Sequence, residues 1–589
     1  MALSGRPATL RFVVVADSHI RFPDDDVDTY PSNALMVERN QHVVDLCNQI
    51  DAAFVVHLGD IVHPLPVEAA HEPAVQLASE VYAGLRHPIH YVAGNHDIGD
   101  KPNALVAVPA VADENYSIYE RYWGPAFRSF EIDDCHFVIV DTPVLNSGLA
   151  REDAQRRWLE ADLNAAADAG LRIFLFTHYP PFVRDRHEAE HYDNLGEPAR
   201  SWLLDLLADH GVEALFAGHV HNFLYNRHGA TDLYVLPATG FVRPDYSESA
   251  AVAPESEGGR DDPAKLGFFV VDVGPDGPDG HQVSPVRTYG AVGGVDAAAS
   301  SLDIVLRRDW ETPLGVTLRH GWMSTVDFPT AGLDEFGRKT VRNDALLLAL
   351  WEARIRDVRV PVADVATLEG AARVRHLADR GMRFSVRSAG VPDPVTRDAV
   401  LAVSTHIVRW EITVLPEQFA ATATFLAGHS MPDGLTVAIA PIVPLGSPGA
   451  AVHHFVSCGF VPVGDDLLER WCRLDPSSSA GEVVFRVAAG DPIAAGVAAA
   501  GSTAKRVRRD AVVIAELPRG GENTVFGDDE AVAAHVAAVA AAARDNPDSV
   551  VFLDAFMDHD RSYYPRHGLI DRRFNPRLAL RQLMEEASR

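Results

Sequence analysis

The sequence predicts an α/β protein built from two domains. Apolar, β-branched runs of strand length alternate with helical patterns along most of the 589 residues, and a stretch of small residues interrupts the alternation midway. A chain of this length is too long to fold around one hydrophobic core. Because the strand-like runs are almost continuously apolar, we expect sheets that are covered on both faces.

The first domain is predicted to span residues 1–292. Its strand-like runs lie at Leu10–Ala16, Phe54–Leu58, His90–Ala93, His136–Val140, Arg172–Phe176, Ala214–Ala217, Leu233–Leu236 and Phe268–Val273. Helical patterns such as Ala154–Ala167 and Ala199–Asp209 separate several of these runs. The segment from Gly274 to His281 is rich in Gly, Pro and Asp, which predicts a hairpin inside this domain.

A second domain is predicted at residues 302–589, after a small and polar linker at residues 293–301. Repeated strand and helix patterns there fit a (β/α)8 barrel, a TIM-like fold. The strand-like runs are Gly315–Leu318, Asp357–Val362, Arg383–Arg387, Ile407–Val414, Leu435–Ala440, Phe455–Val461, Glu482–Val487, Ala511–Glu516 and Val550–Asp554. One of them must lie outside an eight-stranded barrel, and we expect it to be Phe455–Val461. A helix is expected over Thr340–Ile355.

Composition restricts the partners and the location. A formal net charge of −30 repels a polyanion, so no nucleic-acid partner is expected. No run of eighteen apolar residues and no signal-like first segment occurs, so no membrane association is expected. Four cysteines without a CxxC pair favour a reducing, cytoplasmic location. The sequence carries no signal for the oligomeric state.

Side chains that can bind metal ions follow several apolar runs of the first domain. They are Asp17, His19, Asp60, Asn95, His178, His219 and His221. Residues i and i+2 of a strand share a face, so Asp17 and His19 can reach the same ion. Asp60 supplies a carboxylate that can bridge two cations. Nitrogen and oxygen ligands without thiolates suit Mn, Fe or Zn.

The blocks that carry these residues resemble, in content and order, those of the calcineurin-like metallophosphoesterases. The blocks are Asp17-Ser18-His19, Gly59-Asp60, Gly94-Asn95-His96-Asp97, His178 and Gly218-His219-Val220-His221, within residues 8–290. The resemblance implies a four-layered αββα sandwich with two metal ions at the carboxyl ends of strands. It also implies that one ion is bound by Asp17, His19 and His221. The other ion would then be bound by Asn95, His178 and His219, with Asp60 as the bridge.

Two metal ions about 3.5–4 Å apart indicate hydrolysis of a phosphate ester. The attacking group would be a hydroxide that bridges the metals, because two cations strongly lower its pKa. His96 is placed to donate either a hydrogen bond to the phosphate or a proton to the leaving oxygen. Asp97 is expected to orient the His96 ring. Other nearby histidines have different expectations. His57 is predicted to be a core histidine, whereas His63 either lines the site or packs elsewhere.

Substrate contacts are predicted from polar residues near the blocks. Tyr179 follows His178, Lys101 follows the GNHD block, and Arg243 follows the run Leu233–Leu236. An arginine can clamp a phosphate with two hydrogen bonds, although such residues can also brace loops. We favour a small-molecule phosphodiester as the substrate, with the barrel aiding its recognition. The alternative is a phosphomonoester of a sugar or polyol.

Two carboxylates suggest a further alternative for the second domain. Glu411 and Glu516 fall on the fourth and seventh strands of the predicted barrel. This placement resembles that of retaining glycoside hydrolases, whose carboxylates lie about 5–5.5 Å apart, and would make the protein bifunctional. Otherwise both carboxylates are ion-paired. The polar segment Asp554–Pro576 is expected either to bind a sugar or polyol or to form a salt-bridged cap. A metal-dependent scaffold without turnover is the remaining alternative, and the presence of His96 argues against it.

Overall fold

The computed structural model describes residues 10–103, 108–250, 252–274, 280–290, 302–307, 310–319, 322–330, 337–443, 456–517, 528–558 and 567–589. The chain forms two compact units. The first comprises Met1–Leu306 with Ser324–Leu348, and the second comprises Arg307–Met323 with Ala349–Arg589. The predicted linker at residues 293–301 lies outside the described residues. Ser324–Leu348 falls within the predicted second domain in sequence but groups with the first unit.

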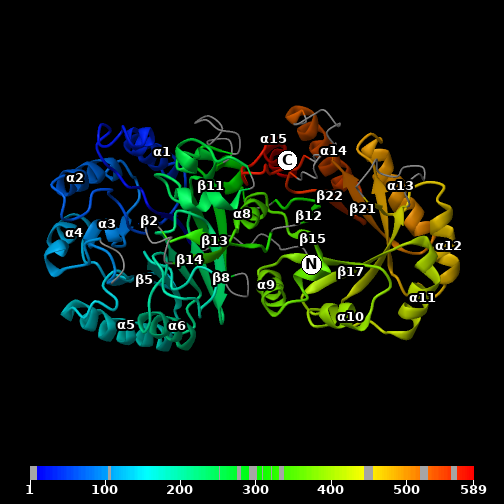
Figure 1. Ribbon diagram of the computed structural model, residues 1–589, viewed down its shortest axis with the longest axis horizontal. Coiled ribbons are helices and arrows are strands. Elements are labelled where there is room, and N and C mark those ends of the chain that lie inside the picture. Colours follow the sequence, from blue (N-terminus) through cyan, green and yellow to red (C-terminus); the bar gives the residue numbers. More distant parts are fainter. Residues whose placement is uncertain are drawn as a thin grey trace. The chain divides into compact units, whose positions relative to one another are not determined.

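Two sheets form the centre of the first unit (Figure 1). The five-stranded sheet has the order β11-β10-β1-β2-β3, and the six-stranded sheet has the order β4-β5-β6-β7-β9-β8. The first contains β1 (Leu10–Val15), β2 (Phe54–His57), β3 (Ile89–Tyr91), β10 (Gly267–Val273) and β11 (His281–Arg287). The second contains β4 (Arg128–Ile132), β5 (Cys135–Ile139), β6 (Arg172–Thr177), β7 (Ala214–Ala217), β8 (Leu224–His228) and β9 (Thr231–Val235). The antiparallel pair β10–β11 confirms the predicted hairpin. The edge strands β4 and β8 were not predicted because their mixed polar sequences form no apolar run.

Phenylalanine rings from both sheets fill the space between them. Phe12 stacks on Phe54 with ring centroids 5.1 Å apart and meets Phe137 of the other sheet edge-on at 5.5 Å. Side chains alternate along a strand, so Ile173 and Leu175 of β6 face the opposite side. There α5 (Ala150–Asp168) and α6 (Ala199–Asp209) cover the sheet. The other sheet is covered by α1 (Met36–Cys47), α2 (His71–Tyr82) and α4 (Tyr116–Trp123). The result is the expected αββα sandwich.

A two-stranded hairpin follows the first barrel strand in the chain. Strands β13 (Thr325–Pro329) and β14 (Arg338–Arg342) pair antiparallel, and α8 (Ala345–Glu352) follows them. The predicted helix over Thr340–Ile355 is therefore wrong in its first residues, which belong to β14. Phe328 and Val341 join the apolar cluster under α5 and α6. This tertiary packing, rather than the local apolar pattern, decides the structure of the segment.

The second unit is a closed barrel of eight parallel strands. They are β12 (Gly315–Thr317), β15 (Asp357–Pro361), β16 (Arg383–Ala389), β17 (Ile407–Val414), β18 (Thr436–Val443), β20 (Glu482–Val487), β21 (Asp510–Glu516) and β22 (Ser549–Asp554). The ring closes where β17 pairs with β18 and β12 pairs with β22. The short β19 (Ser457–Cys458) pairs antiparallel with β18. The barrel is therefore confirmed, as is the exclusion of the run Phe455–Val461.

Helices connect most of the barrel strands. They are α9 (Leu368–Asp379), α10 (Pro394–Leu401), α11 (Phe419–Gly428), α12 (Asp466–Leu474), α13 (Ile493–Arg506), α14 (Asp529–Asp545) and α15 (Leu578–Ala587). Among them, α9 packs on β16, α13 packs on β20 and β21, and α14 packs on β22, as the outer layer of such a barrel requires. Among the described residues, no helix combines the length and the apolar character that crossing a membrane would need.

The barrel interior combines an apolar cluster with a buried ion cluster. Ala438, Val484, Ile514 and other small or apolar residues form the first. In the second, Arg359 binds both carboxylate oxygens of Glu411, at 2.6 and 2.9 Å, and Arg387 adds a contact of 3.1 Å. Burial would raise the pKa of Glu411, but the two arginines outweigh it and lower that pKa to about 2.

Substituting Glu411→Gln is expected to destabilise the barrel. Removing one partner of a buried ion pair leaves an uncompensated charge and costs about 3–5 kcal/mol. The measurement is the free energy of unfolding from urea titration, followed by a far-ultraviolet signal. The exposed Glu417, which follows β17, offers the control Glu417→Gln, which should change little. Equal stability of both variants would show that the ion cluster does not support the barrel.

Candidate metal centre

The candidate metal ligands leave the carboxyl ends of neighbouring strands. Asp17 and His19 follow β1, Asp60 follows β2, and Asn95 begins the short helix α3 (Asn95–Ile98) after β3. From the other sheet, His178 follows β6, and His219 with His221 follows β7. Strands β1, β2 and β3 run parallel to each other, as do β6 and β7. All these loops therefore leave at the carboxyl ends of their strands.

The seven side chains converge in the interior. Donor atoms of Asp17, His19, Asp60 and His221 lie within 4.8 Å of one another, and so do those of Asp60, His178 and His219. Asp60 thus belongs to both groups. Nε2 of His19 lies 3.0 Å from Nε2 of His221. Asn95 joins the second group, with its Oδ1 2.9 Å from Nε2 of His178 and 3.0 Å from Nδ1 of His219. None of the seven residues is more than 4% exposed.

The outer nitrogens of the imidazoles fit a metal-binding role. His178 donates from Nδ1 to the Leu58 carbonyl at 2.8 Å, and His221 donates from Nδ1 to the Phe241 carbonyl at 2.9 Å. His219 donates from Nε2 to the Tyr192 carbonyl at 3.2 Å. Because a carbonyl only accepts, each outer nitrogen carries a proton, and the inner nitrogen is the one that can bind a metal ion. Proteins orient metal-binding histidines in this way, so the donor set fits two metal ions.

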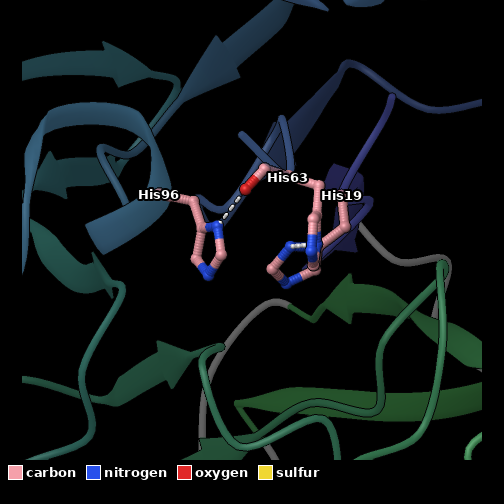
Figure 2. Close-up of side chains that lie close together, drawn as sticks. All are labelled: His19, His63 and His96. Atoms are coloured by element: carbon pink, nitrogen blue, oxygen red, sulfur yellow. Dashed lines mark hydrogen bonds between the residues drawn. The ribbon is translucent and has the colours of Figure 1, made fainter. Parts of the chain in front are cut away.

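The fourth imidazole, His19, has a side chain as its outer partner. Its Nδ1 lies 3.3 Å from Nδ1 of His63 (Figure 2). If His19 Nε2 binds a cation, its Nδ1 carries the proton and donates it to His63. His63 therefore lines the site. In the sequence, His63 lies three residues after Asp60. That spacing alone does not show whether His63 lines the site or packs elsewhere.

The backbone around the centre is held in an uncommon conformation. Five of the seven candidate ligands have positive φ, namely Asp17 (54°), His19 (45°), Asp60 (51°), His219 (68°) and His221 (55°). Such angles are rare in residues other than glycine and concentrate at functional sites. Gly94 permits the closest approach, since a Cβ there would lie 2.1 Å from the amide nitrogen of Asp60. The loops are thus shaped to bring ligands together rather than to minimise local strain.

Burial and charge set the protonation of the cluster. Burial would raise the pKa of Asp60, but nearby imidazoles, His178 first, hold it well below its usual range. Burial would lower the pKa of His178, but Asp60 outweighs it and raises that pKa to about 9. Burial lowers the pKa of His221 to about 3 and that of His219 well below its usual value. Asp60 is therefore ionised and His219 and His221 are neutral at neutral pH, as metal binding requires, whereas His178 must release a proton when an ion binds.

His96 lies beside this cluster, 4.7 Å from His19 between ring centroids. Its Nδ1 donates to the backbone carbonyl of His63, and its other ring nitrogen points away from that carbonyl (Figure 2). Its backbone N–H donates to Oδ1 of Asp60 at 2.8 Å. Asp97 does not orient the His96 ring as expected. Its carboxylate accepts from the backbone N–H of Gly94 at 2.8 Å and of Ile61 at 3.0 Å, so it fixes the loops that carry the ligands.

The three predicted substrate contacts are engaged with other protein groups. Tyr179 is fully buried and donates to Asp100, and its ring lies 4.2 Å from that of His219. The buried Lys101 donates to the carbonyls of His191, at 2.7 Å, and Asn194. Arg243 pairs with Asp193 and, at 2.9 Å, with Asp245. Lys101 and Arg243 thus brace the loop at residues 191–194.

The two barrel carboxylates are ion-paired. Glu411 is fully buried within β17, between Arg359 and Arg387. Glu516 ends β21, and its carboxylate lies 3.7 Å from the guanidinium of Arg486. Residues 559–566 of the polar segment Asp554–Pro576 lie outside the described residues. At its start, Asp554 accepts from Nε of Arg319 at 2.7 Å.

Aromatic residues close to the ligands were not predicted from the sequence. Phe241 lies 4.6 Å from His221 and 4.8 Å from His19 between ring centroids. Tyr192 lies 4.7 Å from His219. Neither belongs to a ligand block.

Comparison with known proteins agrees with this geometry. Residues 10–223 match the family described as calcineurin-like phosphoesterase. The chain is 26% identical to the serine/threonine-protein phosphatase CPPED1 of Danio rerio over 38% of this chain and 71% of that protein. It is also 26% identical to the glycerophosphodiester phosphodiesterase GpdQ of Enterobacter lignolyticus over 38% of this chain and 76% of that protein.

Among solved structures, a dimetal phosphatase from Danio rerio covers 46% of this chain and 94% of its own chain, with 15% identity and a TM-score of 0.33. The family match shows that residues 10–223 form a calcineurin-like metallophosphoesterase domain. Members of this family bind two metal ions, and the clustered Asp and His residues are where this chain could hold them.

Substituting His63→Ala is expected to weaken Mn²⁺ binding at the His19 side of the centre. Loss of a residue that orients a metal ligand typically costs about 10- to 100-fold in affinity. The His63 carbonyl that holds His96 belongs to the backbone and is retained. Isothermal titration with Mn²⁺ measures the effect. The control is His87→Ala, because His87 contacts the Ile50 carbonyl outside the centre. Unchanged affinity in the His63 variant would contradict the role of His63.

Proposed function

We propose that the protein hydrolyses a small-molecule phosphodiester with two metal ions bound by Asp17, His19, Asp60, Asn95, His178, His219 and His221. The observation that carries the proposal is the convergence of these seven buried side chains beside His96. When bound, Mn, Fe or Zn ions at such a centre supply an activated water and offset the charge on the phosphoryl group.

The chain's own residues position the reaction and move a proton. The Asp60 carboxylate belongs to both ligand groups, so it fixes the two halves of the centre relative to each other. The His96 Nδ1–H is held by the His63 carbonyl, which leaves Nε2 to deliver a proton to the leaving oxygen. Such general acid catalysis contributes about 10²- to 10⁴-fold to a rate. Asp97 keeps the Gly94 and Ile61 backbones in place and so maintains the ligand loops.

Charge supports a diester over a monoester. A monoester carries two negative charges near neutral pH, and a diester carries one. The cations Arg243 and Lys101 beside the ligand loops are already engaged with carboxylates or carbonyls. The whole chain has a net charge of −30, which disfavours a dianion further. The similarity to GpdQ points to diesters as well, whereas the similarity to CPPED1 favours a monoester as the second candidate.

Side-by-side hydrolysis of bis(4-nitrophenyl) phosphate and 4-nitrophenyl phosphate tests the proposal. We expect the Mn-reconstituted protein to turn over the diester faster, and chelation of the metal to abolish activity. His96→Ala should lower kcat about 10²- to 10⁴-fold, because the leaving oxygen loses its proton donor. His87→Ala should leave kcat unchanged. Faster turnover of the monoester would favour a phosphomonoesterase that acts on a sugar or polyol phosphate.

Arg21 is the residue that we propose contacts the substrate anion. It is 8% exposed, and its buried Nε has no hydrogen-bond partner within the part of the chain that is described. It follows Ile20, whose carbonyl accepts from the His63 N–H at 3.0 Å. Burial lowers the pKa of His63, and the charges of His96 and then Arg21 lower it further. A buried guanidinium without a carboxylate is costly unless a ligand supplies the anion.

Arg21→Met should raise KM for the ester. Losing a charge-assisted hydrogen bond costs about 1.5–3 kcal/mol, or roughly 10- to 100-fold in affinity. Steady-state kinetics with bis(4-nitrophenyl) phosphate measure this change, together with inhibition by inorganic phosphate. Arg86→Met, at an exposed arginine, is the control. If KM and phosphate inhibition stay at the wild-type level, Arg21 does not contact the substrate.

We propose that the barrel helps to recognise the organic part of the substrate. Support comes from the polar side chains in and above its interior, among them Arg387, whose Nε contacts Glu411 and whose side chain is 27% exposed. A separate carbohydrate activity is the other candidate, favoured by the positions of Glu411 and Glu516 on strands four and seven. If Glu516→Gln changed a phosphate-independent activity, that alternative would stand.

We place the protein in the cytoplasm on the basis of its four unpaired cysteines.

A further inference from the structure

A lysine from the hairpin β13–β14 is completely buried in the phosphoesterase unit. The ammonium of Lys339, in β14, lies 2.5 Å from Asp193 and 2.7 Å from Asp245, and its side chain is 0% exposed. In sequence, Lys339 is 146 residues away from Asp193. A lysine is almost never fully buried unless it is paired, and here two carboxylates provide the pairing.

Asp193 is the centre of a balanced set of charges. Its Oδ2 accepts from Lys339 and, at 2.8 Å, from the hydroxyl of Tyr246, while its Oδ1 accepts from Arg243. Arg243 and Lys339 both reach Asp245 too. Two cations thus neutralise two carboxylates, and Asp193 is fully buried. Removing Lys339 would leave one carboxylate in excess.

The residue before Asp193 contacts the metal centre directly. The Tyr192 carbonyl accepts from Nε2 of His219 at 3.2 Å, and the Tyr192 hydroxyl lies 3.4 Å from Nδ2 of Asn95. Arg243 lies over the Tyr192 ring, 5.2 Å from its centroid. The interactions that hold Asp193 in place therefore also hold the neighbouring Tyr192 carbonyl, which orients His219. His219 and Asn95 are both candidate ligands of the same ion.

The hairpin itself is anchored independently of Lys339. Asp344 accepts from the backbone N–H of Tyr225 in β8 at 2.9 Å, and Arg342 donates to the Tyr225 carbonyl at 2.8 Å. Phe328 of β13 packs on Tyr246 with ring centroids 4.9 Å apart. The position of Lys339 is thus set by the sandwich, so its ammonium can serve as a fixed point for the loop at residues 191–194.

We propose that Lys339 is a positioning residue for the metal centre, acting through Asp193 and the Tyr192 carbonyl on His219. In this role it raises the affinity for the ion that His178 and His219 would bind. The proposal rests on the proposed function only for its kinetic readout, because metal binding can be measured without a substrate. Lys339, which supports the metal centre in this proposal, thus belongs to a segment that follows the first barrel strand in the sequence.

The test is Mn²⁺ titration by calorimetry of the full-length wild type, Lys339→Met, Asp193→Asn and the double variant. Each single variant should bind one of two ions about 10- to 100-fold more weakly, as is usual when a group that orients a ligand is lost. The double variant should be no worse than the weaker single variant, because both substitutions break the same connection. Arg338→Met, at the exposed neighbouring position, is the matched control and should bind both ions normally.

Kinetics and thermal unfolding separate positioning from mere stability. We expect Lys339→Met to lower kcat for bis(4-nitrophenyl) phosphate, with KM changed less, at temperatures where unfolding shows it to be folded. If Lys339→Met does not fold, Asp193→Asn carries the test alone. Wild-type affinity for both ions in the folded single variants, or losses that simply add in the double variant, would overturn the proposal. A wild type that binds two ions but hydrolyses no phosphate ester would overturn only the proposed function.

Discussion

The N-terminal unit depends on keeping one ionised carboxylate, that of Asp60, inside the protein. Its oxygens lie 3.3 Å from Nε2 of His178 and 3.5 Å from Nε2 of His19. A buried charge needs several strong partners to be tolerated. The strained loops, the close approach of Gly94 and the inward-facing imidazole nitrogens surround this carboxylate with possible metal ligands. The imidazoles alone balance it in part, and metal ions would complete the balance.

The barrel solves the same physical problem in a different way. Glu411 is as buried as Asp60, yet the fold itself supplies its counter-charges through Arg359 and Arg387. Fixed guanidinium groups leave no coordination position for an ion. The N-terminal half thus keeps the buried carboxylate of Asp60 available for binding metal ions. The barrel neutralises the buried carboxylate of Glu411 with its own arginines. This contrast explains why similar acidic residues on strands do not imply similar roles.

The sequence predicts those features of the structure that depend on local residue patterns. The ligand-type residues each follow an apolar run, so the strands that bring them together could be predicted, as could the eight-stranded barrel. Prediction fails where long-range contacts decide the outcome. The local pattern predicts a helix at Thr340, because nothing local shows that β14 packs on the sandwich. The partners of Arg243 and Lys101 could not be predicted either. A sequence shows which residues are charged but not which carboxylate or carbonyl each of them contacts. Asp97 sits next to His96, yet bonds to the backbone of two other loops.

The hairpin β13–β14 belongs to the first unit, although it follows the first strand of the barrel in the sequence. The phosphoesterase unit is completed by residues encoded after the first barrel strand. Recombination that exchanged one barrel for another at residues 293–301 would also exchange Lys339, and would leave Asp193 and Asp245 with an unbalanced charge. The two halves are therefore not interchangeable modules. An exchange of the barrel that removed Lys339 would need compensating changes at the two aspartates, which links the evolution of one half to that of the other.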